Sequence, residues 1–344
     1  MSTQKEILQF LHYNPSSSRV EIANALSEAP NERTLKRIIA DSVQKGEILV
    51  EGRGRATRYS LSPQAILMMP LDIETYFSDD IDERKVHESF NFNLINDVLP
   101  KVNLFTPEES EKLESAHIEF LAHMKTLSEL EYNKEMERLG VDLSWKSSQI
   151  EGNTYSLLET ERLLKERQTA EGKTKEEAVM LLNHKDALDF VLEHPEYFKE
   201  ISIKHIEELH EILIKELGVN SGIRKRRVGV TGTNYRPLDN EFQIREALEC
   251  TCKLINNKTN VFEKALLALV LLSYIQAFID GNKRTARILS NAILIAWGYC
   301  PLSFRTVDSI EYKKAMLIFY EQNNIVAFKK IFIEQYEFAV KNYF

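Results

Sequence analysis

The feature that most constrains the fold is a pair of long apolar segments separated by a short polar break. The segments cover residues 265–278 (ALLALVLLSYIQAF) and 288–297 (ILSNAILIAW), and the break covers residues 279–287 (IDGNKRTAR). Apolar runs of this length with so few charges predict helices that are buried on most of their sides. The chain is therefore expected to fold as a helical bundle with these two helices at its centre.

The break carries the residues expected of an anion-binding site. A helix N-terminus presents unpaired backbone N–H groups, and Gly281 lets the backbone turn tightly into such a start. Arg284 and Arg287 are three residues apart on one helix face, so both guanidinium groups can reach one anion. Asp280, beside phosphate oxygens, is suited to complete the shell of a Mg²⁺ ion. The break predicts nucleotide phosphate bound at a helix start, with a solvated polar loop as the simpler alternative.

The letters QAFIDGNKRTAR resemble the signature of the Fic-domain family, usually written H-x-F-x-(D/E)-G-N-(G/K)-R-x-x-R. The matching residues are Phe278, Asp280, Gly281, Asn282, Lys283, Arg284 and Arg287. The resemblance implies protein adenylylation, the transfer of AMP from ATP with Mg²⁺ to a Ser, Thr or Tyr hydroxyl of a target protein. It also implies that Asp280 takes the metal and that the residues from Gly281 to Arg287 that match the signature hold the nucleotide.

One signature position does not match, because Gln276 stands where the family has its catalytic His. An imidazole accepts a proton near neutral pH, whereas a Gln amide accepts a hydrogen bond but is almost non-basic. General-base help is typically worth about 10²–10⁴ in rate, so transfer should be severely slowed while nucleotide binding persists. The alternative from another class is a non-catalytic nucleotide-binding regulator, coupled to DNA or to a protein partner.

Upstream, SSQIEGN resembles the inhibitory motif of many Fic proteins, (S/T)-x-x-x-E-(G/N). Ser147, Glu151 and Gly152 take its positions, within an expected inhibitory helix at 144–153. The resemblance implies that Glu151 pairs with Arg287, which would otherwise hold the γ-phosphate of the nucleotide. A surface carboxylate at a helix end is the alternative.

Residues 223–237 interrupt the helical pattern with glycines and an alternating run, which predicts a β-hairpin. The segment resembles the Fic flap, which lies over the active site and pairs with the target segment. The residues assigned to target binding are Val228, Gly229, Val230, Thr231 and Gly232. An exposed hairpin edge offers unpaired backbone groups to an extended peptide. A plain connecting hairpin is the alternative.

Residues 1–63 resemble a winged helix-turn-helix, with three helix-like segments followed by two strand-like runs around Gly-Arg-Gly-Arg. DNA contact would use residues 33–58, with Arg53, Arg55 and Arg58 on backbone phosphates. This domain has nine Lys and Arg against seven Asp and Glu, a balance of only +2. Winged helices also mediate protein interaction and homodimerisation, so the choice between DNA and protein partners stays open.

The remaining organisation follows from these assignments. Residues 64–107 are interpreted as a linker, and residues 108–344 as the Fic domain with its inhibitory helix and flap. The expected fold class is mostly α, a Fic helical bundle with a β-hairpin flap, preceded by a small winged helix-turn-helix domain.

Composition limits the expected class of protein and its expected cellular compartment. Hydrophobic residues at 43% and charged residues at 28% are ordinary for a soluble protein, and the net charge of −8 argues against a general nucleic-acid-binding surface. No run approaches about 18 apolar residues, so no membrane partner is expected. Cys250, Cys252 and Cys300 are interpreted as buried thiols of a reducing compartment, and with no signal-like N-terminus the cytoplasm is expected.

Overall fold

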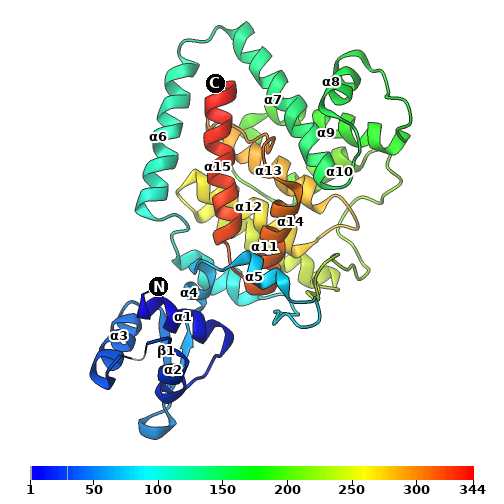
Figure 1. Cartoon of the computed structure of the whole chain (residues 1–344). Helices are drawn as coiled ribbons and strands as arrows, with labels where there is room; N and C mark the ends of the chain where they lie inside the picture. The colour runs from blue at the N-terminus through cyan, green and yellow to red at the C-terminus, as the bar shows by residue number, and fades with distance from the viewer. Residues whose placement is uncertain (1, 29) are drawn as a thin grey trace.

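The structure is a computed structural model that describes residues 2–28 and 30–344 (Figure 1). A small N-terminal domain precedes a large helical domain. The first consists of α1 (Thr3–Tyr13), α2 (Arg19–Ala25), α3 (Glu32–Gln44), β1 (Ile48–Glu51), the 3₁₀ turn Gly54–Ala56 and β2 (Arg58–Leu61). The rest consists of α4 (Pro63–Met68), α5 (Ile73–Ser78), α6 (Pro107–Met124), α7 (Glu129–Ile150), α8 (Leu157–Glu166), α9 (Lys175–Glu193), α10 (Ile203–Ile214), α11 (Glu241–Asn257), α12 (Val261–Ile275), α13 (Asn282–Ala296), α14 (Ser309–Gln322) and α15 (Val326–Tyr343), with short helical turns at Leu94–Val98, Leu99–Lys101 and Pro195–Phe198.

The N-terminal domain has its own small core. Its three helices place Ile7, Leu11, Ile22 and Leu35 against the buried end of the β1–β2 hairpin. The two strands are antiparallel, with Ile48 opposite Leu61 and Glu51 opposite Arg58. The order of helices and strands is the one expected from the sequence. The assignment to the winged-helix class and the contact with DNA stay predictions.

The two apolar segments form α12 and α13, which lie side by side in the middle of the helical domain (Figure 1). Every residue of α12 is buried, and α13 is buried along almost its whole length. The surrounding helices include α7, α9, α10, α11, α14 and α15. Burial on every side explains why α12 lacks a polar face. The polar side of α13, which carries Arg284, Arg287 and Asn291, is buried as well and forms hydrogen bonds inside the protein. The predicted position of the two helices is therefore confirmed.

Residues 64–107, interpreted as a linker, begin against the core of the N-terminal domain at Met69, and most of the segment then packs on the helical domain. Leu67, Leu94 and Leu99 belong to its main core, and Phe90 stacks on Tyr274 of α12 with ring centroids 4.7 Å apart. These side chains contact several different helices, so no single periodicity governs their spacing. That is why the sequence suggests a linker here.

Residues 223–237, here called the flap loop, do not form the predicted β-hairpin. Among the described residues the only sheet is the β1–β2 pair, and the flap loop contributes one isolated parallel bridge, Arg236 with Ser89. The loop is fixed instead by Arg224, a buried side chain that donates hydrogen bonds to the carbonyls of Gln276 (2.6 Å), Arg226 (2.7 Å) and Leu238. These bonds hold the two ends of the loop together without a strand ladder.

No helix in the described part of the chain is long and apolar enough to cross a bilayer.

Candidate active site

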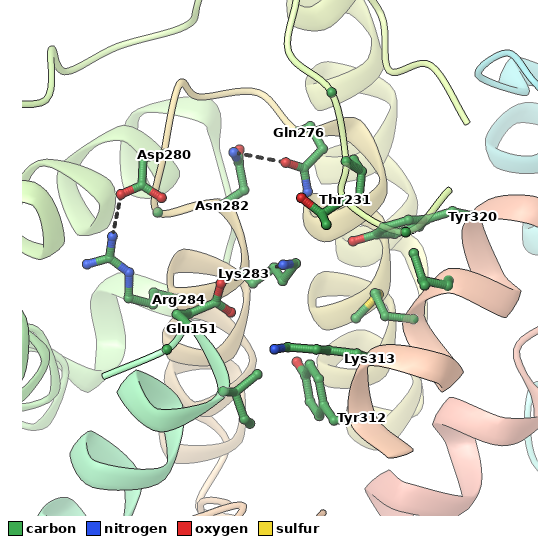
Figure 2. A pocket seen from close by; sticks show the side chains of 18 of the residues that line it. Glu151, Thr231, Gln276, Asp280, Asn282, Lys283, Arg284, Tyr312, Lys313 and Tyr320 are labelled. Carbon is green, nitrogen blue, oxygen red and sulfur yellow. Dashed lines mark hydrogen bonds and ion pairs between the residues drawn. The ribbon is translucent and has the colours of Figure 1, made fainter. Parts of the chain in front are cut away.

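A cavity of about 600 Å³ lies where the α12–α13 turn meets the C-terminal end of α7, the flap loop and α14 (Figure 2). Most of the residues predicted from the three motifs lie on its wall. They are Glu151, Gly152, Gly229, Val230, Thr231, Gly232, Gln276, Asp280, Gly281, Asn282, Lys283 and Arg284. Ser147, Val228 and Arg287 are not on the wall. The fold thus brings together segments more than 100 residues apart in sequence.

The N-terminus of α13 faces this cavity. Gly281 is the N-cap residue, with φ +80° and ψ 0°, a left-handed conformation that favours glycine. A Cβ at this position would lie 3.2 Å from Ile214 Cγ2 and 3.4 Å from His210 Cδ2, so space also favours glycine. A glycine cap has no side-chain acceptor, which leaves the N–H groups of the first turn available to an anion.

The turn before α13 is held rigidly by Asn282 and His210. Asn282 accepts a hydrogen bond from Phe278 N and donates one to Phe278 O, both at 2.8 Å. The His210 ring stacks on Phe278 with centroids 3.6 Å apart, and its Nε2 lies 3.0 Å from the Asp280 carbonyl oxygen. Burial lowers the pKa of His210 to about 4, so the ring is neutral at neutral pH. Asn282 therefore serves the turn with its side chain, and only its backbone N–H is free for a ligand.

Arg284 brings a buried guanidinium to the cavity wall. It donates to the Asp280 carboxylate at 2.9 Å (Figure 2), and it also donates to the Leu213 carbonyl at 3.2 Å. Burial lowers the pKa of Arg284 from its usual value, while Asp280 and Glu151 oppose that shift. The Asp280 side chain itself is 58% exposed. The described residues contain no group of three or more His, Cys, Asp and Glu side chains that could hold a metal alone.

Arg287 lies behind the wall and is fully buried. Its Nε donates to Ser147 Oγ at 2.7 Å, and one terminal nitrogen donates to the Ser147 carbonyl at 3.0 Å and to Glu151 Oε1 at 3.1 Å. Lys283 Nζ lies 3.5 Å from the other oxygen of Glu151. Burial would raise the pKa of Glu151, but Arg287 and Lys283 outweigh it and lower the pKa below its usual value.

Glu151 is the C-cap residue of α7, a helix of 22 residues. The segment 144–153 expected as an inhibitory helix is thus the end of a longer helix plus the turn that follows it. This position holds the Glu151 carboxylate between the cavity and Arg287.

Gln276 ends α12 in a left-handed conformation, with φ +52° and ψ +54°. Its amide nitrogen donates to the Ser273 carbonyl at 2.6 Å, and its amide oxygen accepts a hydrogen bond from Asn282 at 3.3 Å (Figure 2). The side chain that takes the place of the signature His is therefore engaged with its own helix end and turn. Unlike the imidazole of a His, its amide group is almost non-basic.

Several residues at or behind the site gave no usable signal in the sequence. His184 is fully buried behind the wall, with Nε2 2.6 Å from Ser147 Oγ, and burial together with the charge of Arg287 lowers its pKa well below the usual value. Tyr312, Met316 and Tyr320 line the cavity from one face of α14. Both tyrosine hydroxyls are buried and lack a hydrogen-bond partner among the described residues. Their spacing equals that of core aromatics, so the sequence alone gives no reason to place them at a site.

Comparisons with known proteins agree with this geometry. Residues 200–294, which include α10, the flap loop and the α12–α13 turn, match the sequence model of the Fic/DOC family. Protein adenylyltransferase Fic of Drosophila willistoni is 31% identical over 156 residues, which cover 44% of this chain and 31% of the relative. Protein adenylyltransferase fic-1 of Caenorhabditis elegans is 30% identical over 173 residues, which cover 47% and 33%.

Solved structures give the same fold. A fragment of C. elegans Fic-1 superposes with a TM-score of 0.57 at 22% identity, covering 69% of this chain and 71% of that one. A Fic domain containing signalling protein from Bacteroides thetaiotaomicron gives 0.56 at 18% identity, covering 67% and 94%. These matches support a Fic domain in the helical part of this chain. The aligned part spans about a third of the length of the curated relatives.

Proposed function

We propose that this chain is a Fic-type protein adenylyltransferase that is inhibited by Glu151 and slowed by Gln276. The observation that carries the proposal is the meeting of three features at one cavity: the uncapped start of α13, the buried Arg284, and Glu151 in contact with the buried Arg287. Helix N–H groups and guanidinium groups are the donors that phosphate oxygens prefer. The curated relatives named protein adenylyltransferase add support for ATP as the donor of the transferred group.

In this proposal the first turn of α13 and Arg284 hold the inner phosphates, and Arg287 meets the γ-phosphate once Glu151 withdraws. Asp280 fits a Mg²⁺ ligand because its carboxylate is exposed on the cavity wall and Mg²⁺ is commonly held by one or two carboxylates together with phosphate oxygens. The ion would neutralise charge on the phosphates. The flap loop would receive the target segment, whose hydroxyl would approach Gln276.

A second candidate is a nucleotide-binding regulator without transfer activity. The bonds of the Gln276 amide to Ser273 and Asn282 favour it, because they use the polar atoms that would otherwise orient a hydroxyl. In that case nucleotide occupancy would be passed to the N-terminal domain and its DNA or protein partner.

Transfer of label from α-labelled ATP to protein separates the two candidates. Gln276→His restores a base and Glu151→Gly frees Arg287, so the double variant should label itself or a target well above the parent, by roughly 10²-fold or more. Gln276→Ala with Glu151→Gly is the matched control and should stay near background. If the His double variant also stays at background with ATP and Mg²⁺, the adenylyltransferase proposal is wrong.

A further inference from the structure

A segment that leads from α5 into the helical domain runs along the flap loop. This segment, residues 81–91, is here called the connector. Its contacts with the flap loop include Asn234 Nδ2 to the Ile81 carbonyl (3.2 Å) and the Asp82 carboxylate (3.0 Å), and Arg236 N to the Glu88 carbonyl (2.8 Å). In the described residues the flap loop belongs to no sheet, and its one bridge, Arg236 with Ser89, is itself made with the connector, so these bonds are a main source of its order on this side.

Arg84 in the connector joins two walls of the cavity from outside. One terminal nitrogen of its guanidinium donates to the Gly232 carbonyl at 2.8 Å, and the other lies 3.3 Å from the Glu321 carboxylate. Gly232 lines the cavity from the flap loop, and Glu321 directly follows Tyr320, which lines it from α14. The side chains of Arg84 and Glu321 are 5% and 0% exposed, so water competes little for their ion pair, whereas the bond to Gly232 lies at an exposed part of the flap loop.

The carboxylate end of this bridge is itself fixed. The Tyr76 hydroxyl donates to the same oxygen of Glu321 at 2.5 Å, and the Arg84 guanidinium lies 5.0 Å from the centre of the Phe77 ring. Next to Arg84, Lys85 Nζ donates to the Tyr13 carbonyl of the N-terminal domain at 2.8 Å. The connector therefore contacts the flap loop, α14 and the N-terminal domain within a few residues.

We propose that Arg84 is a positioning residue that holds the flap loop over the cavity and links its placement to the N-terminal domain. Loss of the guanidinium would release the Gly232 carbonyl, and the loop would then be held by Arg224 at its ends and by the bonds of Asn234 and Arg236 to the connector. The role of the loop in receiving a target rests on the proposed function, whereas the anchoring of the loop by Arg84 does not depend on nucleotide.

Limited trypsin digestion reports the anchoring, because Lys225, Arg226 and Arg227 are exposed in the flap loop. Cleavage requires the loop to open, and its rate follows the population of the open form when closing is fast. A hydrogen bond from a charged group is worth roughly 1.5–3 kcal/mol, so Arg84→Met should speed cleavage at these sites about tenfold or more. Arg245→Met, on an exposed face of α11, is the matched control and should cleave at the parent rate.

Three further measurements separate anchoring from general destabilisation. Arg84→Lys should restore part of the protection, and cleavage in the exposed loop 167–173 should not change. Asn234→Ala should speed flap-loop cleavage about threefold, and it decides the question if Arg84→Met does not fold. The proposal would be overturned if the rate of flap-loop cleavage stayed within twofold of the control in both Arg84→Met and Asn234→Ala. It would also be overturned if cleavage in loop 167–173 accelerated by the same factor as cleavage in the flap loop. If no variant binds ATP in calorimetry while the cleavage result holds, the proposed function fails and the positioning role stands.

Discussion

Replacement of Glu151 by Gln keeps the shape of the side chain and removes its charge. Arg287, which is 0% exposed, then loses the carboxylate at 3.1 Å that is its only one among the described residues, and Lys283 loses the same partner at 3.5 Å. Breaking a buried ion pair from one side typically costs about 3–5 kcal/mol. We expect the low end, roughly 3 kcal/mol, because the Glu151 side chain is 22% exposed and Arg287 keeps two bonds to Ser147.

ATP should reverse this loss. Its γ-phosphate can replace the missing carboxylate in the variant, whereas in the parent it must displace Glu151. At an ATP concentration 100 times the dissociation constant for the variant, ligand linkage gives about 2.7 kcal/mol of stabilisation, and the parent should gain less. Urea denaturation with and without ATP and Mg²⁺ measures both quantities, with Glu171→Gln, an exposed position, as control. A variant as stable as the parent, with equal gains from ATP, would refute this account of Arg287.

Three other perturbations have defined outcomes. Burial keeps the pKa of His184 well below 6.5 in the folded state, so below that pH the unfolded chain binds more protons than the folded chain. As the pH falls below 6.5, this residue should therefore remove up to about 1.4 kcal/mol of stability for each pH unit. His184→Gln should flatten the pH dependence of the urea midpoint. Gly281→Ala should cost about 1–2 kcal/mol from the left-handed backbone alone and weaken ATP binding in calorimetry, because the new methyl meets Ile214. If the hairpin of the N-terminal domain contacts DNA, replacement of the exposed Arg53 and Arg55 by Ala should lower the slope of log affinity against log salt by about 2, while an unchanged slope would favour a protein partner.

The parts of the site that the sequence predicts are those fixed by local chemistry. The start of α13 follows from Gly281 at the end of an apolar run, and the charges of Arg284 and Arg287 follow from their spacing on a helix. The ion pair of Glu151 with Arg287 joins residues 136 apart in sequence, and only the resemblance to a known motif suggested it.

The flap loop shows why the remaining parts of the site could not be predicted from the sequence. Its alternating residues predict a hairpin, yet its shape is set by Arg224, which bonds a carbonyl 52 residues away, and by Arg84, which bonds one 148 residues away. An arginine that bonds distant backbone carbonyls leaves no periodic pattern in the sequence. Tyr312 and Tyr320 were hidden for another reason, because a tyrosine that lines a cavity from a helix has the same spacing as one that fills a core.

The most direct test of the central claim is the calorimetric affinity for ATP and ADP of Glu151→Gly alone and combined with Arg287→Ala. Only ATP has the γ-phosphate that Arg287 would hold, and a charge-assisted contact of this kind is worth roughly 1.5–3 kcal/mol. Glu151→Gly should bind ATP at least as tightly as the parent, and the added Arg287→Ala should weaken ATP about 10-fold or more while ADP changes little. Equal losses for both nucleotides would remove Arg287 from the γ-phosphate, and no binding of ATP by Glu151→Gly would contradict a nucleotide site at the start of α13.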